Sequence, residues 1–373
     1  MKPLGLYIHI PFCPYRCHYC DFVITVGREQ KIPDYVKAIC LDLKQYAETM
    51  PGYEIASIYI GGGTPSLLPP SYIEEILICA RESFRAHSDL EISLESNPET
   101  LTIGSLVGYR KAGTNRLSLG VQSTHPKHLK RMGRGHTTEE AHRVFLLARE
   151  AGFENLNVDL MFGLPDQTVE EWDDTLAEVL SWKPDHLSAY GLQVEEKTAF
   201  WKENRKGLLL IPEQESQAQM YEALIETCAK HGLEQYEISN FAKTGRACRH
   251  NLIYWHNEEY LGIGLGAVSY IEGTRFWMTR NFKTFLSGEE RIVGNETLDN
   301  RRQLGESLML ALRLKEGISL NQFRAHFSTD LKAIYPTELD RYTQLGLLNL
   351  QGDRLALSPK GMLLSNEVLQ AFI

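Results

Sequence analysis

The feature that most constrains this chain is a group of three cysteines close to its N-terminus. Cys13, Cys17 and Cys20 fall within eight residues, in a C-x3-C-x2-C spacing that directly follows a strand-like run. Three thiolates on one tight loop can reach three corners of an iron–sulfur cube, which normally takes four thiolates. The spacing therefore predicts a four-iron, four-sulfur cluster in which one iron stays open for a small chelating ligand.

Two other interpretations of these cysteines stay open. A structural zinc site needs four ligands and usually contains paired C-x2-C spacings. Here the fourth ligand would be His9, His18 or a distant residue, and the sequence has no second C-x2-C pair. The cysteines could also be small core residues, but a turn that contains Pro14, Arg16 and His18 is a poor place for core packing.

Charge and composition restrict the class of protein. The 373 residues carry a net charge of −9, which argues against a dedicated nucleic-acid binder, because such proteins need a basic face. No segment approaches the roughly 18–20 uninterrupted apolar residues of a membrane-spanning helix. Residues 1–10 have no apolar signal region. We therefore expect a cytoplasmic protein with no integral membrane segment and no nucleic-acid partner, in which reducing conditions disfavour disulfides.

Short apolar runs alternate with helical patterns over the first half of the chain. The runs that predict strands are Leu6–Ile10, Ala56–Ile60, Leu90–Leu94, Asn115–Val121, Asn155–Phe162 and His186–Tyr190. Helical periodicity covers Tyr35–Ala47, Thr137–Ala151 and Glu170–Leu180. This alternation predicts an α/β fold, a partial (β/α)6 TIM-like barrel with ligands at the carboxyl ends of its strands. A full eight-unit barrel is less supported, because the pattern becomes irregular after Lys197.

The C-terminal part of the chain has a different pattern. Asn300–Leu314 reads as a long amphipathic helix, and residues 347–350 and 354–357 read as two strands joined by a turn. Ser358 and Pro359 then open a last helix, with Ser358 as its N-cap. We expect a barrel domain over residues 1–290 and a small winged-helix-like domain over residues 300–373.

Polar residues follow the predicted strands at the points where the strands end. Gly61–Ser66 follows the second strand, and three glycines there permit close backbone approach to a ligand. Glu95, Gln122 and Asp159 lie at or near the ends of the next three strands. Any one of these alone would be expected to cap a helix or satisfy a turn. Because these residues occupy equivalent positions at the ends of successive strands, together they predict a site for one polar ligand.

The cysteine motif resembles that of the radical S-adenosylmethionine (SAM) superfamily. The resemblance implies that the open iron is chelated by the amino and carboxylate groups of SAM, which the reduced cluster cleaves to a 5′-deoxyadenosyl radical. It also implies a role for Arg134, whose guanidinium suits the SAM carboxylate. The residues that it assigns to SAM are Tyr7, Gly62, Gly63, Thr64, Glu95, Gln122, Arg134 and Asp159.

Further motifs are similar to those of the oxygen-independent coproporphyrinogen III oxidase-like family. They are Leu6–Cys13, Gly61–Pro65 and Gly120–Ser123. The decarboxylating dehydrogenases of that family extend the cysteine motif to C-x3-C-x2-C-x-C and carry a longer N-terminal segment. Here Phe22 stands at the last cysteine position, and twelve residues precede Cys13. Both departures argue against dehydrogenase activity and agree with the HemW-type haem chaperone branch.

The same branch is marked by an HNxxYW motif, which this chain has at residues 250–255. A histidine near Tyr and Trp is by itself more often a packed residue, but the resemblance implies that His250 contacts haem. Cys248 is a second, lower-ranked haem ligand. The Gly-rich segment Leu261–Ala267 reads equally well as a ligand-approaching loop or as a flexible connection. Cys40, Cys79 and Cys228, which lie on helical patterns, are expected in the core.

The resemblance thus implies a protein that carries a [4Fe-4S] cluster and SAM, binds haem and transfers it to haem-accepting proteins. A radical enzyme acting on coproporphyrinogen III or a related porphyrinogen is the alternative, and a zinc-stabilised binding module is a third. The sequence leaves open whether the protein forms a homodimer.

Overall fold

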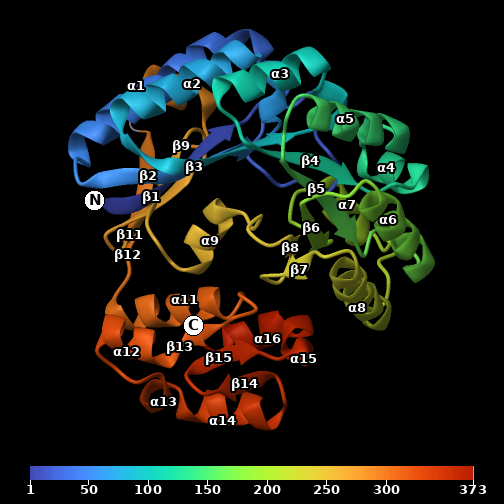
Figure 1. The fold of residues 1–373 in the computed structure, drawn as a ribbon, viewed down its shortest axis with the longest axis vertical. Helices are drawn as coiled ribbons and strands as arrows, with labels where there is room; N and C mark the ends of the chain where they lie inside the picture. The colour runs from blue at the N-terminus through green and yellow to red at the C-terminus, as the bar shows by residue number, and fades with distance from the viewer. Residues whose placement is uncertain (290, 373) are drawn as a thin grey trace.

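The computed structural model describes residues 1–289 and 291–372, and it contains two β-sheets. The larger sheet has twelve strands in the order β12-β11-β10-β9-β1-β2-β3-β4-β5-β6-β8-β7, and the smaller has the order β13-β15-β14. In Figure 1 the two sheets belong to an upper, curved α/β body and a lower, mainly helical body. The predicted domain ends at residues 290 and 373 lie outside the described residues.

Six parallel strands form the centre of the large sheet. They are β1 Lys2–Ile10, β2 Tyr53–Gly62, β3 Arg85–Ser96, β4 Arg116–Gln122, β5 Asn155–Phe162 and β6 His186–Gly191. Each apolar run lies within one of these strands, apart from Asn115, which precedes β4 by one residue, although β1, β2 and β3 start three to five residues earlier than predicted. The prediction of six βα units is therefore confirmed. Since the strands are parallel and paired in chain order, all their carboxyl ends lie along one edge of the sheet.

The sheet is open rather than closed into an eight-unit barrel. Beyond β1 it continues with β9 Tyr260–Ile263, which is parallel to β1, and then with antiparallel β10 Val268–Ile271, β11 Thr274–Met278 and β12 Ile292–Thr297. Beyond β6 lie β8 Asn240–Ala242 and β7 Glu234–Gln235. No pairing between β12 and β7 exists within the described residues. The first half of the Gly-rich segment 261–267 is thus strand β9, which neither interpretation of that segment foresaw.

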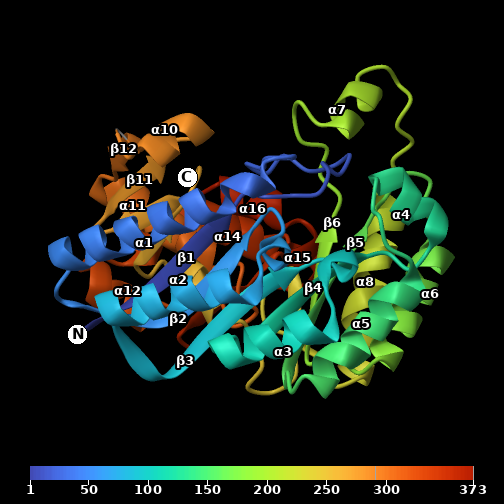
Figure 2. The same cartoon turned by 90° about the horizontal axis from the view of Figure 1, so that it is seen from above.

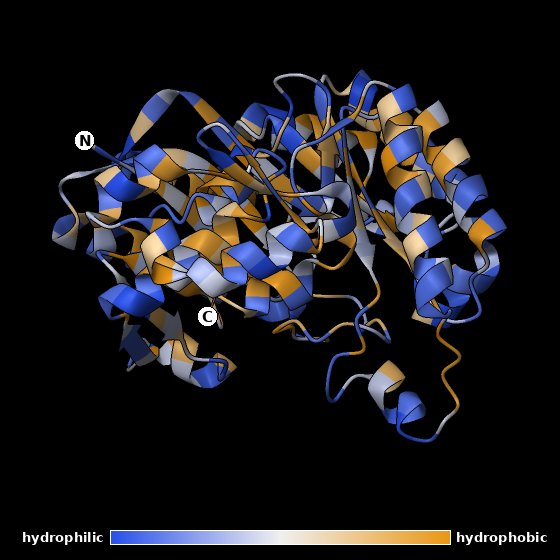
Figure 3. Cartoon of the chain, turned by 90° about the horizontal axis from the view of Figure 1, so that it is seen from below, coloured by the Kyte–Doolittle hydropathy of each residue, from blue (hydrophilic) through white to orange (hydrophobic). Residues whose placement is uncertain are grey.

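Helices cover the outer, convex face of the parallel strands (Figures 1 and 2). They are α1 Ile32–Thr49, α2 Pro70–Ser83, α3 Ile103–Ala112, α4 Pro126–Met132, α5 Thr138–Glu150 and α6 Val169–Ser181. The predicted capping box at the start of α6 is present, because Thr168 accepts from the backbone of Glu171 and Glu171 accepts from that of Thr168. Apolar residues concentrate on the strands, and the helices alternate polar with apolar faces (Figure 3).

The chain after β6 adds smaller elements around this scaffold. They are α7 Ala199–Asn204, α8 Gln214–Lys230, α9 Arg249–Trp255 and α10 Phe282–Ser287. Figure 2 shows α7 and its flanking loops projecting beyond the carboxyl ends of the strands. In Figure 1, α9 lies inside the curve of the sheet and faces the lower body.

The C-terminal body contains the predicted helix, hairpin and capped helix. Its elements are α11 Asn300–Ala311, β13 Ile318–Ser319, α12 Leu320–Phe327, α13 Leu331–Ile334, α14 Pro336–Gln344, β14 Leu348–Gln351, β15 Arg354–Leu357, α15 Pro359–Leu363 and α16 Ser365–Gln370. Ser358 Oγ accepts from the Gly361 amide at 2.9 Å, which confirms the predicted N-cap. Two differences from the prediction are that α11 ends at Ala311 and that the last helix is divided into α15 and α16.

The cysteines outside the N-terminal motif are buried. Cys40, Cys79 and Cys228 pack in the main core, as predicted, and Cys248 is also fully buried. Among the helices of the described residues, none is long and apolar enough to cross a membrane.

Candidate functional site

A cavity of about 320 Å³ opens at the carboxyl ends of the parallel strands. Its lining includes almost every residue predicted for the cluster and for SAM, namely Cys13, Cys17, Cys20, Gly62, Gly63, Thr64, Glu95, Gln122, Arg134 and Asp159. The predicted residues outside it are Tyr7 and His250. The alignment of polar groups along successive strand ends therefore corresponds to one three-dimensional site.

The glycine turn after β2 lies directly against the cysteine loop. The amides of Gly63 and Thr64 donate to the carbonyls of Ile10 and Phe12, each at 2.8 Å. A Cβ atom on Gly63 would lie 2.7 Å from the Phe12 oxygen and 3.0 Å from Cys13 Sγ. Both distances are shorter than a normal contact, so only glycine allows the two loops to approach this closely.

Three free thiols face this cavity. Cys13 Sγ lies 3.4 Å from Thr64 Oγ1, and Cys17 Sγ lies 3.8 Å from Arg134 Nη1. Burial raises the pKa of Cys13 to about 11, so metal binding has to displace its proton. Among the described residues, no three His, Cys, Asp or Glu side chains converge on a single ion. A cubane cluster offers a different iron to each thiolate, so the donor set fits a cluster better than zinc.

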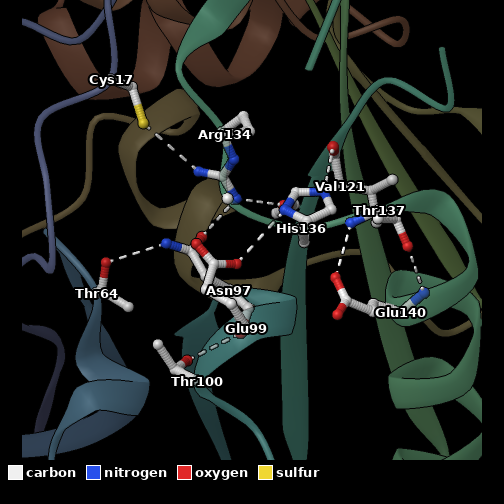
Figure 4. Close-up of polar contacts among 12 residues, drawn as sticks. Cys17, Thr64, Asn97, Glu99, Thr100, Val121, Arg134, His136, Thr137 and Glu140 are labelled. Carbon is white, nitrogen blue, oxygen red and sulfur yellow. Dashed lines mark hydrogen bonds and ion pairs between the residues drawn. The ribbon is translucent and has the colours of Figure 1, made fainter. Parts of the chain in front are cut away.

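Arg134 is held in the cavity by contacts with two strand ends (Figure 4). Its Nη2 donates to Asn97 Oδ1 at 2.8 Å and to the Gly120 carbonyl at 2.6 Å. Asn97 Nδ2 in turn donates to Thr64 Oγ1 at 3.1 Å. Arg134 Nε is buried and has no hydrogen-bond partner within the part of the chain that the structure describes. An unpaired buried donor requires a partner, and a carboxylate of a bound ligand would provide one.

The loop that carries Arg134 is fixed by its neighbours. The ring of His136 contacts the Val121 carbonyl through Nε2 at 3.1 Å, and the Gly135 amide donates to the Tyr15 hydroxyl at 2.8 Å. Burial would raise the pKa of Glu99, but His136, Arg134 and Tyr15 together lower it to about 2. Glu99 is therefore an anion that holds this loop beside the cavity (Figure 4).

Two carboxyl groups line the same cavity. Glu95 accepts from the Gly62 amide at 2.9 Å and from the Tyr59 hydroxyl at 2.8 Å, and burial, together with the charge of Asp159, raises its pKa to about 7. Asp159 accepts from Ser118 at 2.8 Å, and burial raises its pKa as well. A cavity that contains carboxyl groups and a guanidinium complements a ligand with both an ammonium and a carboxylate group.

Gln122, which lines the cavity, has an unusual backbone conformation. Its φ is +69°, in the left-handed region that costs free energy for residues other than glycine. The register between β4 and β5 shifts at this point, between Gly120 and Gln122. The backbone at the end of β4 is therefore irregular at Gln122, whose polar side chain lines the cavity.

Tyr7 lies beside the cavity rather than in it. Its hydroxyl is 3.0 Å from His9 Nδ1, and His9 Nε2 is 2.8 Å from the Val23 carbonyl. Tyr7 lines a neighbouring cavity of about 410 Å³, whose walls also include Gly62 and Glu95. Tyr7 thus shares this neighbouring cavity with Gly62 and Glu95, two of the residues predicted for SAM.

His250 is buried away from both cavities. Its Nδ1 lies 2.8 Å from Ser57 Oγ, its Nε2 lies 2.8 Å from the Tyr254 hydroxyl, and burial lowers its pKa to about 3. Cys248 Sγ donates to Glu91 Oε1 at 3.7 Å. Iron could bind His250 only after a hydroxyl had left one of its ring nitrogens. The haem contact predicted at His250 stays a prediction.

Sequence reasoning missed several residues of the cavity wall. They are Tyr15, Tyr19, Tyr59, Asn97, Met161, Tyr190, Gln193 and Glu195. Asn97 and Tyr190 could have been found, because each follows or ends a predicted strand. Gln193 and Glu195 lie after β6 in an irregular stretch, where the sequence gives no positional signal.

Two family models match the chain. The radical SAM superfamily matches residues 7–179, and the HemN C-terminal domain matches residues 298–364. The heme chaperone HemW of Bacillus subtilis is 37% identical over 98% of both chains, and that of Escherichia coli is 35% identical over 100% of this chain and 99% of its own length. The chain belongs to the HemW family. Membership of the radical SAM superfamily assigns it a [4Fe-4S] cluster and SAM as cofactors.

A solved structure supports the fold of this HemW-family chain. The coproporphyrinogen III oxidase HemN of Escherichia coli superimposes with a TM-score of 0.86, covering 100% of this chain and 90% of its own, at 23% identity. This likeness establishes the radical SAM fold and the C-terminal body that follows it.

Proposed function

We propose that this protein is a cytoplasmic haem chaperone, which binds haem and transfers it to acceptor proteins. The observation that carries the proposal is the full-length match to relatives named heme chaperone HemW, at 32–37% identity in several bacteria. Phe22 at the position of a fourth motif cysteine supports the same assignment. Phe22 is 58% exposed at the wall of the cavity, and a phenylalanine cannot supply a fourth thiolate there.

The cavity at the carboxyl ends of the parallel strands, here called the strand-end cavity, and Tyr7 beside it hold the two cofactors in this proposal. Cys13, Cys17 and Cys20 bind the cluster. SAM is bound by Tyr7, Gly62, Gly63, Thr64, Glu95, Gln122, Arg134 and Asp159. When bound, the cluster supplies an electron-transfer centre with one iron open to a chelating ligand. Arg134 orients the carboxylate of that ligand, and Glu95 accepts from its ammonium group.

The test uses anaerobically reconstituted protein and two parallel assays. In the first, the haem-loaded protein is mixed with an apo-haemoprotein, and transfer is followed by the visible spectrum of the acceptor. In the second, the protein receives coproporphyrinogen III, SAM and a reductant. We expect haem transfer and no sustained decarboxylation. Sustained decarboxylation without haem transfer would show that the protein is a porphyrinogen enzyme instead.

The predicted haem contact of His250 has its own test. Haem is titrated into His250→Ala and into the unchanged protein, and the Soret spectra and affinities are compared. If His250 ligates the iron, the variant loses the ligated spectrum. An unchanged spectrum and affinity would remove His250 from the haem site.

A further inference from the structure

The cavity of about 410 Å³ that Tyr7 lines, here called the junction cavity, adjoins two other cavities. It shares Gly62 and Glu95 with the strand-end cavity, and Val23 and Arg280 with a cavity of about 940 Å³ beside the cysteine loop. Phe22 lines all three. A ligand too large for the junction cavity alone therefore has room to extend into a neighbouring one.

Tyr254 separates the junction cavity from His250. Tyr254 lines this cavity from α9, and its hydroxyl lies 2.8 Å from His250 Nε2. The ring of His250 is 1% exposed and lines none of the three cavities. The two residues are four positions apart, so they lie on the same face of α9, one turn from each other. A ligand in the junction cavity thus meets the phenol before it meets the imidazole.

The second contact of His250 prepares its ring for binding a metal. His250 Nδ1 lies 2.8 Å from Ser57 Oγ on β2. A histidine that ligates a metal usually donates its other ring N–H to a nearby oxygen, which fixes the tautomer and the orientation of the ring. With Ser57 in that part, Nε2 has the lone pair, and the hydroxyl of Tyr254 donates to it.

The side chain of Tyr254 is held by few contacts. Among the described residues, its hydroxyl has no hydrogen-bond partner except His250. Its ring packs edge-on against that of Tyr260, with the centroids 4.6 Å apart, and the junction cavity lies beside it. Turning the ring into that space breaks one hydrogen bond, whose net contribution is small. The turn would leave the lone pair of Nε2 facing the cavity.

The wall of the junction cavity suits a flat aromatic ligand. Phe22 is 58% exposed there, and an exposed ring in a concave wall can pack against the face of such a ligand. Gly266 and Ala267 line the same cavity with little side-chain bulk. They belong to the Gly-rich segment for which the sequence left two interpretations, and their position favours the ligand-approaching loop.

Cationic side chains gather where the junction cavity meets the 940 Å³ cavity. Arg280 lines both, is exposed and forms no ion pair with the described residues. The larger cavity is lined by five cations and three carboxylates, namely Arg16, Arg28, Lys197, Arg280 and Lys283 against Asp21, Glu195 and Glu196. The balance is positive although the whole chain has a net charge of −9. Carboxylates of a ligand are therefore attracted to this side.

We propose that haem enters the junction cavity with its carboxylates toward Arg280, and that Tyr254 is a gate that turns aside before the iron binds His250 Nε2. The inference rests on the proposed function and on the haem contact predicted at His250. It adds Tyr254 as a positioning residue and Arg280 as a residue that selects for the carboxylates of the cargo.

The gate is tested by the kinetics and affinity of haem binding to the full-length, anaerobically reconstituted protein. Tyr254→Phe keeps the ring but removes the hydroxyl that occupies Nε2. We expect haem to bind about two- to tenfold faster and more tightly, the effect of losing one hydrogen bond from the closed state, with an unchanged Soret spectrum. Tyr221→Phe is the matched control, because its hydroxyl donates to the Ile238 carbonyl at 2.8 Å and it lines none of the three cavities.

A second background separates the gate from a general change in packing. In His250→Ala, adding Tyr254→Phe should alter neither the rate nor the affinity, because no imidazole remains to be uncovered. A gain of the same size in that background would overturn the gate. Loss of the Soret spectrum in Tyr254→Phe alone would also overturn it, since that result would make the phenol itself the iron ligand.

Arg280 is tested with two forms of the cargo. Arg280→Gln should bind haem about tenfold more weakly and should bind haem dimethyl ester, which lacks free carboxylates, as the unchanged protein does. Arg205→Gln is the control, because Arg205 is exposed just after α7 and lines none of the three cavities. Equal haem affinities of Arg280→Gln and the unchanged protein would remove Arg280 from the site.

The outcomes distinguish this inference from the proposed function. If the unchanged protein binds no haem, the proposed function fails. If it binds haem, and Tyr254→Phe behaves like Tyr221→Phe, the gate alone is overturned and the haem chaperone assignment stands.

Discussion

Arg134 donates from Nη2 to the side-chain oxygen of Asn97 at 2.8 Å, and this contact joins the loop after β4 to the end of β3. Asn97 Nδ2 in turn donates to Thr64 Oγ1, which lies beside Cys13 Sγ. The guanidinium is therefore fixed before any ligand arrives, while its Nε stays unpaired. A site prepared in this way loses little conformational entropy on binding.

Replacing Arg134 is expected to weaken SAM binding. Arg134→Lys keeps the charge but loses the planar fork, so we expect roughly ten- to a hundredfold weaker affinity, the effect of losing one charged hydrogen bond. The measurement is SAM binding to anaerobically reconstituted protein by calorimetry. Arg131→Ala is the matched control, because Arg131 pairs with Glu203 and does not line the cavity. Equal affinities of Arg134→Lys and the unchanged protein would refute the role.

The glycine at position 63 is expected to be required for cluster assembly. In Gly63→Ala the new methyl group would conflict with Cys13 Sγ and the Phe12 carbonyl, so the cysteine loop has to move. We expect most of the iron and acid-labile sulfide to be lost. Gly52→Ala is the control, because a Cβ there meets no atom within 4 Å. Full iron content in Gly63→Ala would show that the loop can move without losing the cluster.

Glu95 is expected to make the stability of the apo-protein depend on pH. Its pKa is raised from 4.5 to about 7 in the folded chain by burial. Between these values the folded state binds more protons than the unfolded state, so the free energy of unfolding falls as the pH rises. In Glu95→Gln this fall should be smaller by on the order of 2 kcal/mol between pH 5 and pH 8. Urea unfolding at both pH values measures it, and an identical fall in both proteins would contradict the assignment.

His250 is expected to contribute to stability whether or not it contacts haem. His250→Ala removes the contacts with Ser57 and Tyr254 and leaves their hydroxyl groups buried. We expect a loss of about 2–4 kcal/mol in the free energy of unfolding. Ser57→Ala, which removes one of the two contacts, should cost about 1 kcal/mol. A His250→Ala protein as stable as the unchanged one would show that the buried contacts are not maintained in solution.

Much of the fold and of the strand-end site could be predicted because the signals are local. Apolar runs such as Asn155–Phe162 and capping residues such as Thr168 act within a few residues of the elements that they define. Parallel strands then bring their carboxyl ends to one edge, which is why Glu95 and Asp159 could be placed together.

The rest depends on contacts between distant segments. The burial of His250 follows from its contact with Ser57, 193 residues earlier in the chain, which no local pattern encodes. One cavity of about 730 Å³ is lined both by residues near 255 and by residues near 325, and the periodicity of neither segment predicts that they meet. The strand pairing of residues 260–263 was missed for the same reason.

The position of β9 also has a consequence for the order in which the chain is completed on the ribosome. Gly5–Ile8 of β1 pair on one side with β2, which follows closely in the sequence, and on the other with Tyr260–Ile263. Until the second partner has been synthesised, one row of backbone donors and acceptors on the first strand stays unpaired. A nascent chain of some 200 residues thus already contains most of its parallel sheet, but one edge of β1 still has unpaired backbone groups. Such an edge can pair with another chain, and chaperones that bind nascent chains protect surfaces of this kind.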